Sequence, residues 1–319
     1  MEYKFSDRVL TLKPSAIREI FKYAADPSYV SLSAGNPAPE AFPSKQLAAI
    51  SAKLMEDEPI LALQYSTTEG YPPLLRHLKD YMKSSRNIGT EDDGVLVTSG
   101  AQQIMDLFTK SILNEGETVI CEAPSFIGSL NDFRSYKAKL VGIPMDTDGI
   151  VIYAGSFSKV ISPGMRVGYA IGPKPVLAKM TVCKQGQDVH TNIWSQVLCY
   201  RFMTEYDFDA HLAGLRKIYT KKRALLLDLM EKHLAPYITW DPFNGGLFAW
   251  CHLPKGVDMM EFVQKALEKK VCVVPGTAFL TDENEPCDAF RINFSTPTDE
   301  QLTKGITLLG ETIREMVEK

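Results

Sequence analysis

The segment spanning residues 151–169, VIYAGSFSKVISPGMRVGY, decides how the chain folds and where its chemistry lies. Its first apolar residues predict a short buried strand over 151–153, which Gly155 ends. The two serines and the lysine of the SFSK string at 156–159 then fall on the loop at the carboxyl end of that strand. Because open α/β sheets bind their ligands at this edge, we expect a binding site there.

The polar side chains of this loop suit a phosphorylated carbonyl compound. A lysine must be neutral to form a Schiff base, and a desolvated site beside a cation such as Arg166 would favour the neutral amine of Lys159. The hydroxyls of Ser156 and Ser158 and the forked guanidinium of Arg166 would hold a phosphate dianion. The loop therefore predicts an aldimine-forming lysine beside a phosphate site.

An isolated S-x-S-K string is more often a surface loop with a solvated lysine, so the rest of the chain has to support this hypothesis. The same letters also match the S-x-x-K motif of penicillin-binding enzymes. That alternative requires SDN and KTG motifs, and neither string occurs in the chain.

A second phosphate element precedes the lysine segment. GVLVT at 94–98 predicts a buried strand, SG a tight turn, and AQQIMDLFTKSIL at 101–113 a helix with an apolar face. Backbone amides at the start of such a helix meet the positive end of its dipole and favour an anion. Most turns of this kind bind nothing, so it is Lys159 that favours a cofactor site at Ser99, Gly100, Ala101 and Gln102.

The run SFSK followed by PGMRVGY resembles the cofactor-lysine motif of the pyridoxal-phosphate aminotransferases of fold type I. It is most similar to the branch with kynurenine, aromatic and 2-aminoadipate aminotransferases. The resemblance implies an α/β protein, with a mixed, mostly parallel sheet in a large domain and a smaller α+β domain. It also implies pyridoxal 5'-phosphate as cofactor. The implied activity moves an amino group between an L-amino acid and a 2-oxo acid, through a Lys159 aldimine and a pyridoxamine intermediate.

Five further positions match residues of that family in chain order. Phe126 resembles the aromatic residue that covers the pyridine ring. Tyr65 resembles a tyrosine that reaches the cofactor phosphate of the neighbouring subunit, which implies a homodimer with shared active sites. Arg291 resembles the arginine that binds the substrate α-carboxylate, a pairing that suits a guanidinium fork. Gly35 matches a loop that closes over the substrate, and Arg18 an arginine that some relatives use for a distal carboxylate.

One segment of the family pattern is missing between the strand predicted at 139–145 and the lysine strand. The chain has no N-P-x-G motif and no D-x-x-Y motif following a strand, so it lacks the asparagine and aspartate that bond the cofactor ring. Roughly sixty residues or more would hold those two βα units. We therefore expect a shortened sheet with exposed strand edges, uncovered apolar surface and a weak electron sink.

Two explanations of the missing segment stay open at this point. The sequence is either a shortened or gapped version of a full aminotransferase, or a contiguous variant with impaired chemistry. In both cases a protein of these 319 residues is expected to be poorly active.

Apolar patterns divide the chain into three parts: an arm over 1–40 that packs with the small domain, a large cofactor-binding domain over 41–205, and a linking helix with a small domain over 206–319. Beyond the elements above, helices are expected at 15–23, 43–55, 70–84, 175–184, 192–203, 209–234, 259–269 and 298–317. Strands are expected at 118–121, 139–145, 245–251, 271–275 and 289–295.

Composition excludes several classes of function. A net charge of −4 without a long basic run argues against nucleic acid as a partner, and no apolar run has the length of a membrane span. Six cysteines without a C-x-x-C pair and five histidines without ligand spacing argue against a metal site. The expected location is the cytoplasm, with reduced thiols.

Two other functions of the same fold compete with amino-group transfer. One is a catalytically impaired module for cofactor binding or interaction, of the kind fused to DNA-binding regions, although no helix-turn-helix pattern precedes the domain. The other is a pyridoxal-phosphate-dependent lyase or decarboxylase that uses the same lysine and arginine. Only the resemblance favours transfer over these.

Overall fold

The computed structural model describes residues 3–6, 10, 23, 26–142 and 151–318. Contacts group the chain into two units, which are described separately. The first comprises mainly Ala41–Glu122 and Gly128–Leu212, and the second comprises the described part of 13–40, Ala123–Ile127 and Ala213–Lys319. The three-part division expected from the sequence stays a prediction. Within the described residues, no helix has the length and apolar character that a bilayer span requires.

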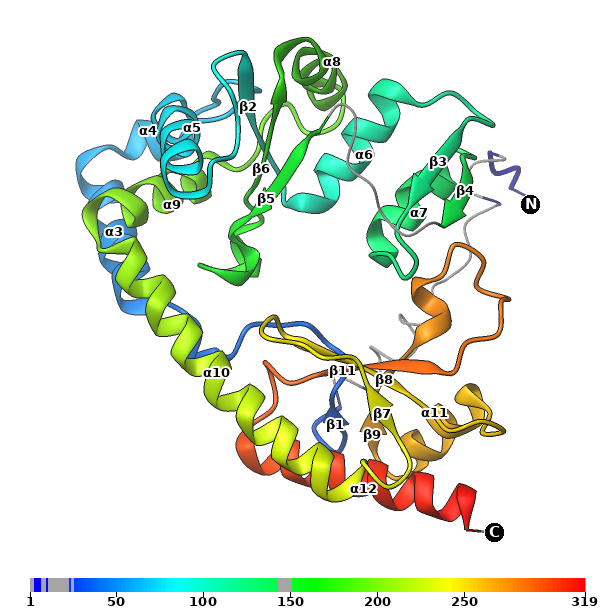
Figure 1. Cartoon of the computed structure of the whole chain (residues 1–319). Coiled ribbons are helices and arrows are strands. Elements are labelled where there is room, and N and C mark those ends of the chain that lie inside the picture. Colours follow the sequence, from blue (N-terminus) through cyan, green and yellow to red (C-terminus); the bar gives the residue numbers. More distant parts are fainter. Residues whose placement is uncertain (1–2, 7–9, 11–22, 24–25, 143–150, 319) are drawn as a thin grey trace. The chain divides into compact units, whose positions relative to one another are not determined.

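The centre of the first unit is an antiparallel three-stranded sheet in the order β2-β6-β5 (Figure 1). Strand β6 (Gly168–Pro173) runs antiparallel to both β2 (Asp93–Thr98) and β5 (Tyr153–Ser156), so the two outer strands run in the same direction. Helices α6 (Ala101–Ile112) and α8 (Lys174–Gln185) pack on one face of this sheet.

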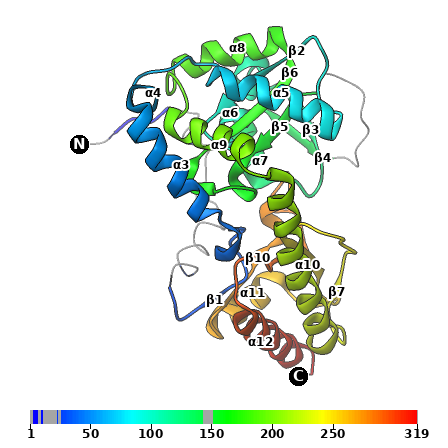
Figure 2. The ribbon, with the colours of Figure 1, turned by 90° about the vertical axis from the view of Figure 1, so that its left-hand side faces the viewer.

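The other face of the sheet carries α5 (Pro72–Arg86) and α9 (Ile193–Glu205), which lie in front of the sheet in Figure 2. Alternation along the strands explains the two faces, since neighbouring residues of a strand point to opposite sides. Leu96 and Ala170 belong to the core shared with α6 and α8, whereas the hydroxyl of Tyr169 lies 3.3 Å from Met82 Sδ of α5. Two shorter helices, α3 (Ser44–Asp57) and α4 (Pro59–Leu63), pack against α9.

A separate two-stranded parallel sheet joins β3 (Thr118–Cys121) and β4 (Lys139–Gly142), with α7 (Ile127–Ser135) between them in sequence. Among the described residues, β3 pairs only with β4 and β5 pairs only with β6. The side chains of Ile120 and Val141 are 62% and 44% exposed. The sequence therefore correctly predicted a shortened sheet with open strand edges and uncovered apolar surface.

The lysine strand differs from its prediction. It covers Tyr153–Ser156 instead of 151–153, so Ser156 is the last strand residue and not a loop residue. Gly155 does not end the strand, because β6 pairs with it and the ring of Tyr169 fills the place of a Cβ atom. Tertiary pairing outweighs the local preference of glycine for turns here.

The second unit contains an antiparallel sheet in the order β10-β11-β8-β7 and a parallel pair β1-β9. Helices α11 (Met259–Glu268) and α12 (Asp299–Val317) and most of α10 (Phe208–His233) cover it. Thr298 caps α12 with Gln301 in a capping box. The strands are β1 (Val30–Ser31), β7 (Thr239–Trp240), β8 (Phe248–His252), β9 (Val271–Cys272), β10 (Val274–Pro275) and β11 (Ala289–Asn293).

Most predicted elements are present, with ends shifted by a few residues. The run predicted as one strand at 271–275 is two short strands, β9 and β10, in different sheets. Strands β1, β6 and β7 and helices α4 and α7 were not predicted. Residues 15–22 of the helix expected at 15–23 and residues 143–145 of the strand expected at 139–145 lie outside the described residues.

Candidate active site

Strand β6 brings the lysine loop and the start of α6 to one edge of the sheet. Its first residue, Gly168, pairs with Ser156 of β5 on one side and with Thr98 of β2 on the other. A Cβ atom at Gly168 would lie 2.7 Å from the carbonyl carbon of Gly100 and 2.9 Å from the backbone nitrogen of Ala101. Only glycine therefore permits this close approach of strand to helix.

The lysine loop is a single turn, η2 (Phe157–Lys159), that follows β5 directly. The backbone N–H of Ser158 donates to Ser156 Oγ at 3.1 Å, and the two hydroxyl oxygens lie 3.0 Å apart. Phe157 is buried and anchors the turn, while Lys159 is exposed. The turn thus presents two hydroxyls and an amine together.

Arg166 places a cation at the start of α6. It follows the turn η3 (Pro163–Met165), has a left-handed backbone with φ of 53°, and its Nη1 donates to the carbonyl oxygen of Pro163 at 3.3 Å. Its guanidinium lies directly against Gly100, where Cζ would be 2.9 Å from a Cβ atom. An exposed arginine is therefore held beside a helix amino terminus.

The amino terminus of α6 can itself hold an anion. Gly100, with φ of 82°, is its N-cap, and no side chain caps the helix. The N–H of Gly100 donates to the carbonyl of Thr98 at 2.8 Å, which leaves the amides of Ala101 and Gln102 in the first turn without helical acceptors. These two amides and Arg166 form a cradle for a phosphate group.

Ser99 is turned away from this cradle. Its N–H donates to Gln103 Oε1 at 2.8 Å and its hydroxyl to Asp188 Oδ2 at 2.7 Å. Asp188 in turn pairs with the fully buried Lys184 at 2.6 Å. The structure therefore gives Ser99 the role of fixing the turn, while its assignment as a cofactor ligand stays a prediction.

Lys184 and Asp188 each affect the pKa of the other. Burial lowers the pKa of Lys184, and its contacts with Asp188 oppose that effect. For Asp188, burial raises the pKa, but hydrogen bonds from Lys184, Ser99 and Gln103 outweigh it and leave the pKa below its ordinary value. A charged pair thus lies under the phosphate cradle.

The side chain of Gln102 is also engaged. Its amide donates to the carbonyl of Gly128 at 3.0 Å and to Asp132 Oδ2 at 2.5 Å. Burial, together with the nearby charge of Asp106, raises the pKa of Asp132 to about 7. Only the backbone of Gln102 then remains for a phosphate group.

The raised pKa of Asp132 predicts a pH-dependent stability. Between about pH 4 and pH 7 the folded state holds a proton that the unfolded state has lost, so stability falls as the pH rises through this window. We expect Asp132→Asn to remove this decline and to be about 1–2 kcal/mol more stable than wild type at pH 8, after discounting for partial exposure. Urea unfolding at pH 5, 6.5 and 8 measures the free energy of unfolding of both proteins. The exposed Asp92→Asn is the control, and a parallel pH dependence in both variants would refute the assignment.

Arg291, on β11 in the second unit, contacts two aromatic rings. Its Cζ lies 3.9 Å from the ring centre of Phe248 and 4.7 Å from that of Phe279. Its Nη2 donates to the carbonyl of Ser33 at 3.2 Å, and its Nε is buried without a hydrogen-bond partner among the described residues. Burial lowers the pKa of Arg291 to about 10, so the side chain stays charged at neutral pH.

Two other predicted residues lie in the same unit as Arg291. The Cα atom of Gly35 packs on the ring of Phe248. Phe126 is 60% exposed, and its neighbour Ser125 donates its N–H to the carbonyl of Phe279 at 2.8 Å. Arg18 lies outside the described residues.

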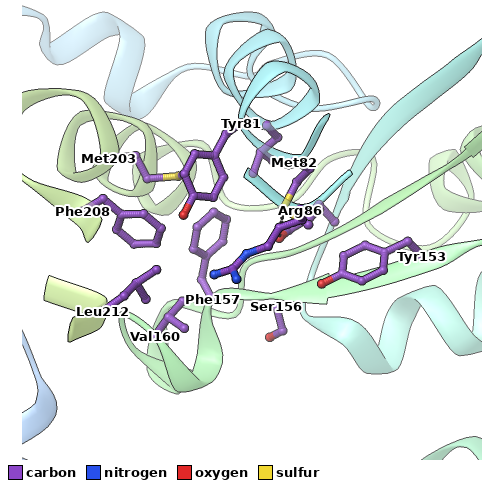
Figure 3. Close-up of a pocket in the computed structure, with 12 residues that line it drawn as sticks. Tyr81, Met82, Arg86, Tyr153, Ser156, Phe157, Val160, Met203, Phe208 and Leu212 are labelled. Carbon is purple, nitrogen blue, oxygen red and sulfur yellow. Dashed lines mark hydrogen bonds between the residues drawn. The ribbon is translucent and has the colours of Figure 1, made fainter. Parts of the chain in front are cut away.

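A pocket of about 350 Å³ lies beside β5 in the first unit (Figure 3). Its lining mixes aromatic and apolar side chains with the guanidinium of Arg86. Ser156, Phe157 and Val160 of the lysine segment belong to its wall. The pocket therefore adjoins β5, which pairs with β6 on one side and with no described strand on the other.

The residues present fit one end of pyridoxal phosphate. The helix amides, the serine hydroxyls and Arg166 suit the phosphate group, and Lys159 suits the carbonyl carbon. The motifs that would supply partners for the ring nitrogen and the phenolic oxygen of the cofactor are missing from their expected places. The single D-x-x-Y string, at 26–29, precedes β1 instead of following a strand, and Asp26 is exposed.

Sequence reasoning missed four residues that shape the two sites. Lys184 and Asp188 are spaced i, i+4, a pattern that usually marks a solvated helix pair. Phe248 and Phe279 lie in apolar runs and carry no motif. Hydrophobic periodicity predicts that phenylalanines such as these lie in a core, but it does not predict which charged side chain they contact.

The chain matches the family model for class I and II aminotransferases over residues 27–150 and 144–309, and it belongs to this family. Aromatic-amino-acid aminotransferase 1 of Thermococcus litoralis is 27% identical, over all of this chain and 96% of the relative. This confirms the family and the transferase class expected from the sequence.

Two solved structures are similar over nearly the whole chain. A Pyrococcus horikoshii kynurenine aminotransferase in complex with PMP is 27% identical, with a TM-score of 0.92 and coverage of 99% of this chain and 98% of the other. LysN, an α-aminoadipate aminotransferase from Thermus thermophilus with N-(5'-phosphopyridoxyl)-L-leucine, is 26% identical, with a TM-score of 0.87 and coverage of 98% of both. The fold is that of the fold type I aminotransferases, and pyridoxal phosphate is the cofactor of this chain, as predicted.

The comparisons also locate the missing segment. The two matches to the family model meet at 144–150, directly before the lysine strand. The alignment with the T. litoralis relative has 400 positions against 319 residues, which leaves at least 81 positions without a residue of this chain. The alignment is thus longer than this chain, and the family match divides where the sequence predicted a missing segment.

Proposed function

We propose that the chain transfers an amino group between an L-amino acid and a 2-oxo acid, with its cofactor held at the edge of the sheet β2-β6-β5. The observation that carries this proposal is the convergence at that edge of Lys159, Arg166 and the open amino terminus of α6. Family membership supports the same reaction class.

Each residue has a role in this proposal. Arg166, Ser156, Ser158 and the first amides of α6 hold the phosphate group, and Lys159 Nζ binds the cofactor. When bound, pyridoxal phosphate supplies an electron sink. Lys159 Nζ would act as a positioned general base that takes the proton from the substrate α-carbon and would then deliver it to the cofactor carbon. Arg291 binds the α-carboxylate, Gly35 belongs to a loop over the substrate, and Phe126 covers the cofactor ring.

A second candidate is a cofactor-binding module with impaired transfer. The family match divides at 144–150, where the segment with the partners of the cofactor ring was predicted to be missing, and this favours the second candidate. Such a module would bind the cofactor at Lys159 without turning over amino acids.

We also propose a cytoplasmic homodimer in which Tyr65 completes the partner's phosphate site. Tyr65 is 81% exposed, and Ile60 and Leu63 just before it are 73% and 71% exposed. Large apolar side chains so close together on a surface favour a protein interface. The six unpaired cysteines agree with a reducing compartment.

Titration with pyridoxal phosphate tests the proposed function. We expect wild type to develop a visible absorption band that an added amino acid diminishes, and Lys159→Ala to develop none. Lys179→Ala, an exposed lysine of α8, is the control and should behave as wild type. A band in Lys159→Ala would refute the lysine assignment, and a band that no amino acid changes would favour the module. Sedimentation velocity on the same sample tests the dimer.

A further inference from the structure

We propose that Phe248 and Phe279 are positioning residues that hold the Arg291 guanidinium in the plane where it receives the substrate carboxylate. This inference rests on the proposed function of Arg291 and adds two residues to it. It follows from a stack of side chains in the second unit that no sequence motif marks.

Two aromatic rings contact the guanidinium of Arg291. The ring centres of Phe248 and Phe279 lie 3.9 Å and 4.7 Å from Arg291 Cζ, both within the range of a cation–π contact. Trp250 packs edge-on against Phe279 with ring centres 5.3 Å apart, at an interplanar angle of 80°. Phe279 belongs to a small core with Val274 and Ala278, so its ring cannot easily turn aside.

Gly35 supports the other end of the stack. A Cβ atom there would lie 2.5 Å from Cζ of the Phe248 ring and 3.1 Å from Cε1. The glycine therefore leaves the space that the ring needs to lie flat on Arg291. Its backbone does not have the left-handed conformation, so space rather than φ explains the glycine.

The geometry restricts how an anion can approach. The guanidinium is planar, so its N–H donors lie along its edge. A planar carboxylate meets that edge with two parallel hydrogen bonds. The buried Nε without a partner shows that the donor set of Arg291 is incomplete within the described residues.

Titration of the full chain with 3-phenylpropionate, a carboxylate without an amino group, tests the inference by calorimetry. We expect Phe248→Leu and Phe279→Leu each to raise the dissociation constant about tenfold, because a desolvated cation–π contact is lost and the guanidinium is freed. Phe248→Tyr keeps the ring and should stay within threefold of wild type. Gly35→Ala should displace the ring and reproduce the effect of Phe248→Leu.

Phe243→Leu is the matched control. Phe243 is also partly buried and lies 5.3 Å from an arginine, Arg223, but it does not contact Arg291. Its replacement should leave the dissociation constant unchanged. If Arg291→Gln binds the probe as wild type does, the proposed function of Arg291 fails. If Arg291→Gln loses binding while the leucine variants and Gly35→Ala stay within twofold, the positioning role is overturned. Should a leucine variant fail to fold, Gly35→Ala and Phe248→Tyr decide between the two outcomes.

Discussion

Insertion of the missing segment between residues 142 and 151 should raise kcat/KM for amino-group transfer by at least about 100-fold. The insert is the segment that carries the N-P-x-G and D-x-x-Y motifs, taken from a family member in which the family match is continuous at this place. Removal of one preorganised polar contact typically costs about 10²–10³ in kcat. The 319-residue chain lacks both motifs that supply partners to the cofactor ring.

The same insertion should also stabilise the first unit. Strands β5 and β3 each have a described partner on one side only. The side chains of Ile120 on β3 and Val141 on β4 are exposed. Added strands would pair with these edges and cover the apolar side chains, so the midpoint of thermal unfolding should rise. Stability and activity are thus two separate readouts of one insertion.

A control separates architecture from chemistry. The same insert with the aspartate of D-x-x-Y replaced by alanine should restore the stability but not the activity. A glycine-serine insert of equal length should restore neither. Ordinary transfer efficiency in the 319-residue chain itself would show that the missing segment is dispensable and would contradict the expectation.

Local sequence patterns predicted the parts of the site that are continuous in the chain. The turn before α6 and the SFSK loop each combine a strand end with polar residues, and both lie at one sheet edge as expected. The glycines, serines and lysine of those strings carry their own chemical signal. This is why the sequence alone singles out Lys159, Arg166 and Gly100 as candidate site residues.

What the sequence did not predict depends on contacts between distant residues. Strand β6 was missed because GYAIGP has glycines that weaken a strand in isolation, although pairing on both sides stabilises it in the sheet. The same pairing extends β5 through Gly155 to Ser156. Phe248 and Phe279 are 31 residues apart and meet only through Arg291. Contacts between such distant residues leave no periodic pattern in the sequence.

Asp188→Ala should destabilise the first unit by about 3–5 kcal/mol, a large part of the stability of an ordinary domain. The replacement leaves the ammonium of Lys184 fully buried without its ion-pair partner. It also removes the acceptor of Ser99 Oγ and of Gln103 Nε2, at 2.7 Å and 2.9 Å. Urea unfolding at neutral pH measures the loss.

Two variants identify the cause of that loss. Asp209→Ala removes an exposed carboxylate that accepts from Tyr81 and should cost less than about 1 kcal/mol. The double replacement Lys184→Met with Asp188→Ala should recover most of the stability, because no buried charge then remains unpaired. Equal losses in the single and double variants would mean that the ion pair is not the reason.

The position of the pair under the phosphate cradle extends the expectation to cofactor binding. Ser99 precedes Gly100, and its hydroxyl and N–H are held by Asp188 and Gln103, so the turn that aims the first amides of α6 depends on this network. Loss of Asp188 should therefore weaken pyridoxal phosphate binding even at low temperature, where the variant is still folded. Asp209→Ala should not. If the folded Asp188→Ala protein binds the cofactor as tightly as wild type, the network stabilises the fold without positioning the cradle.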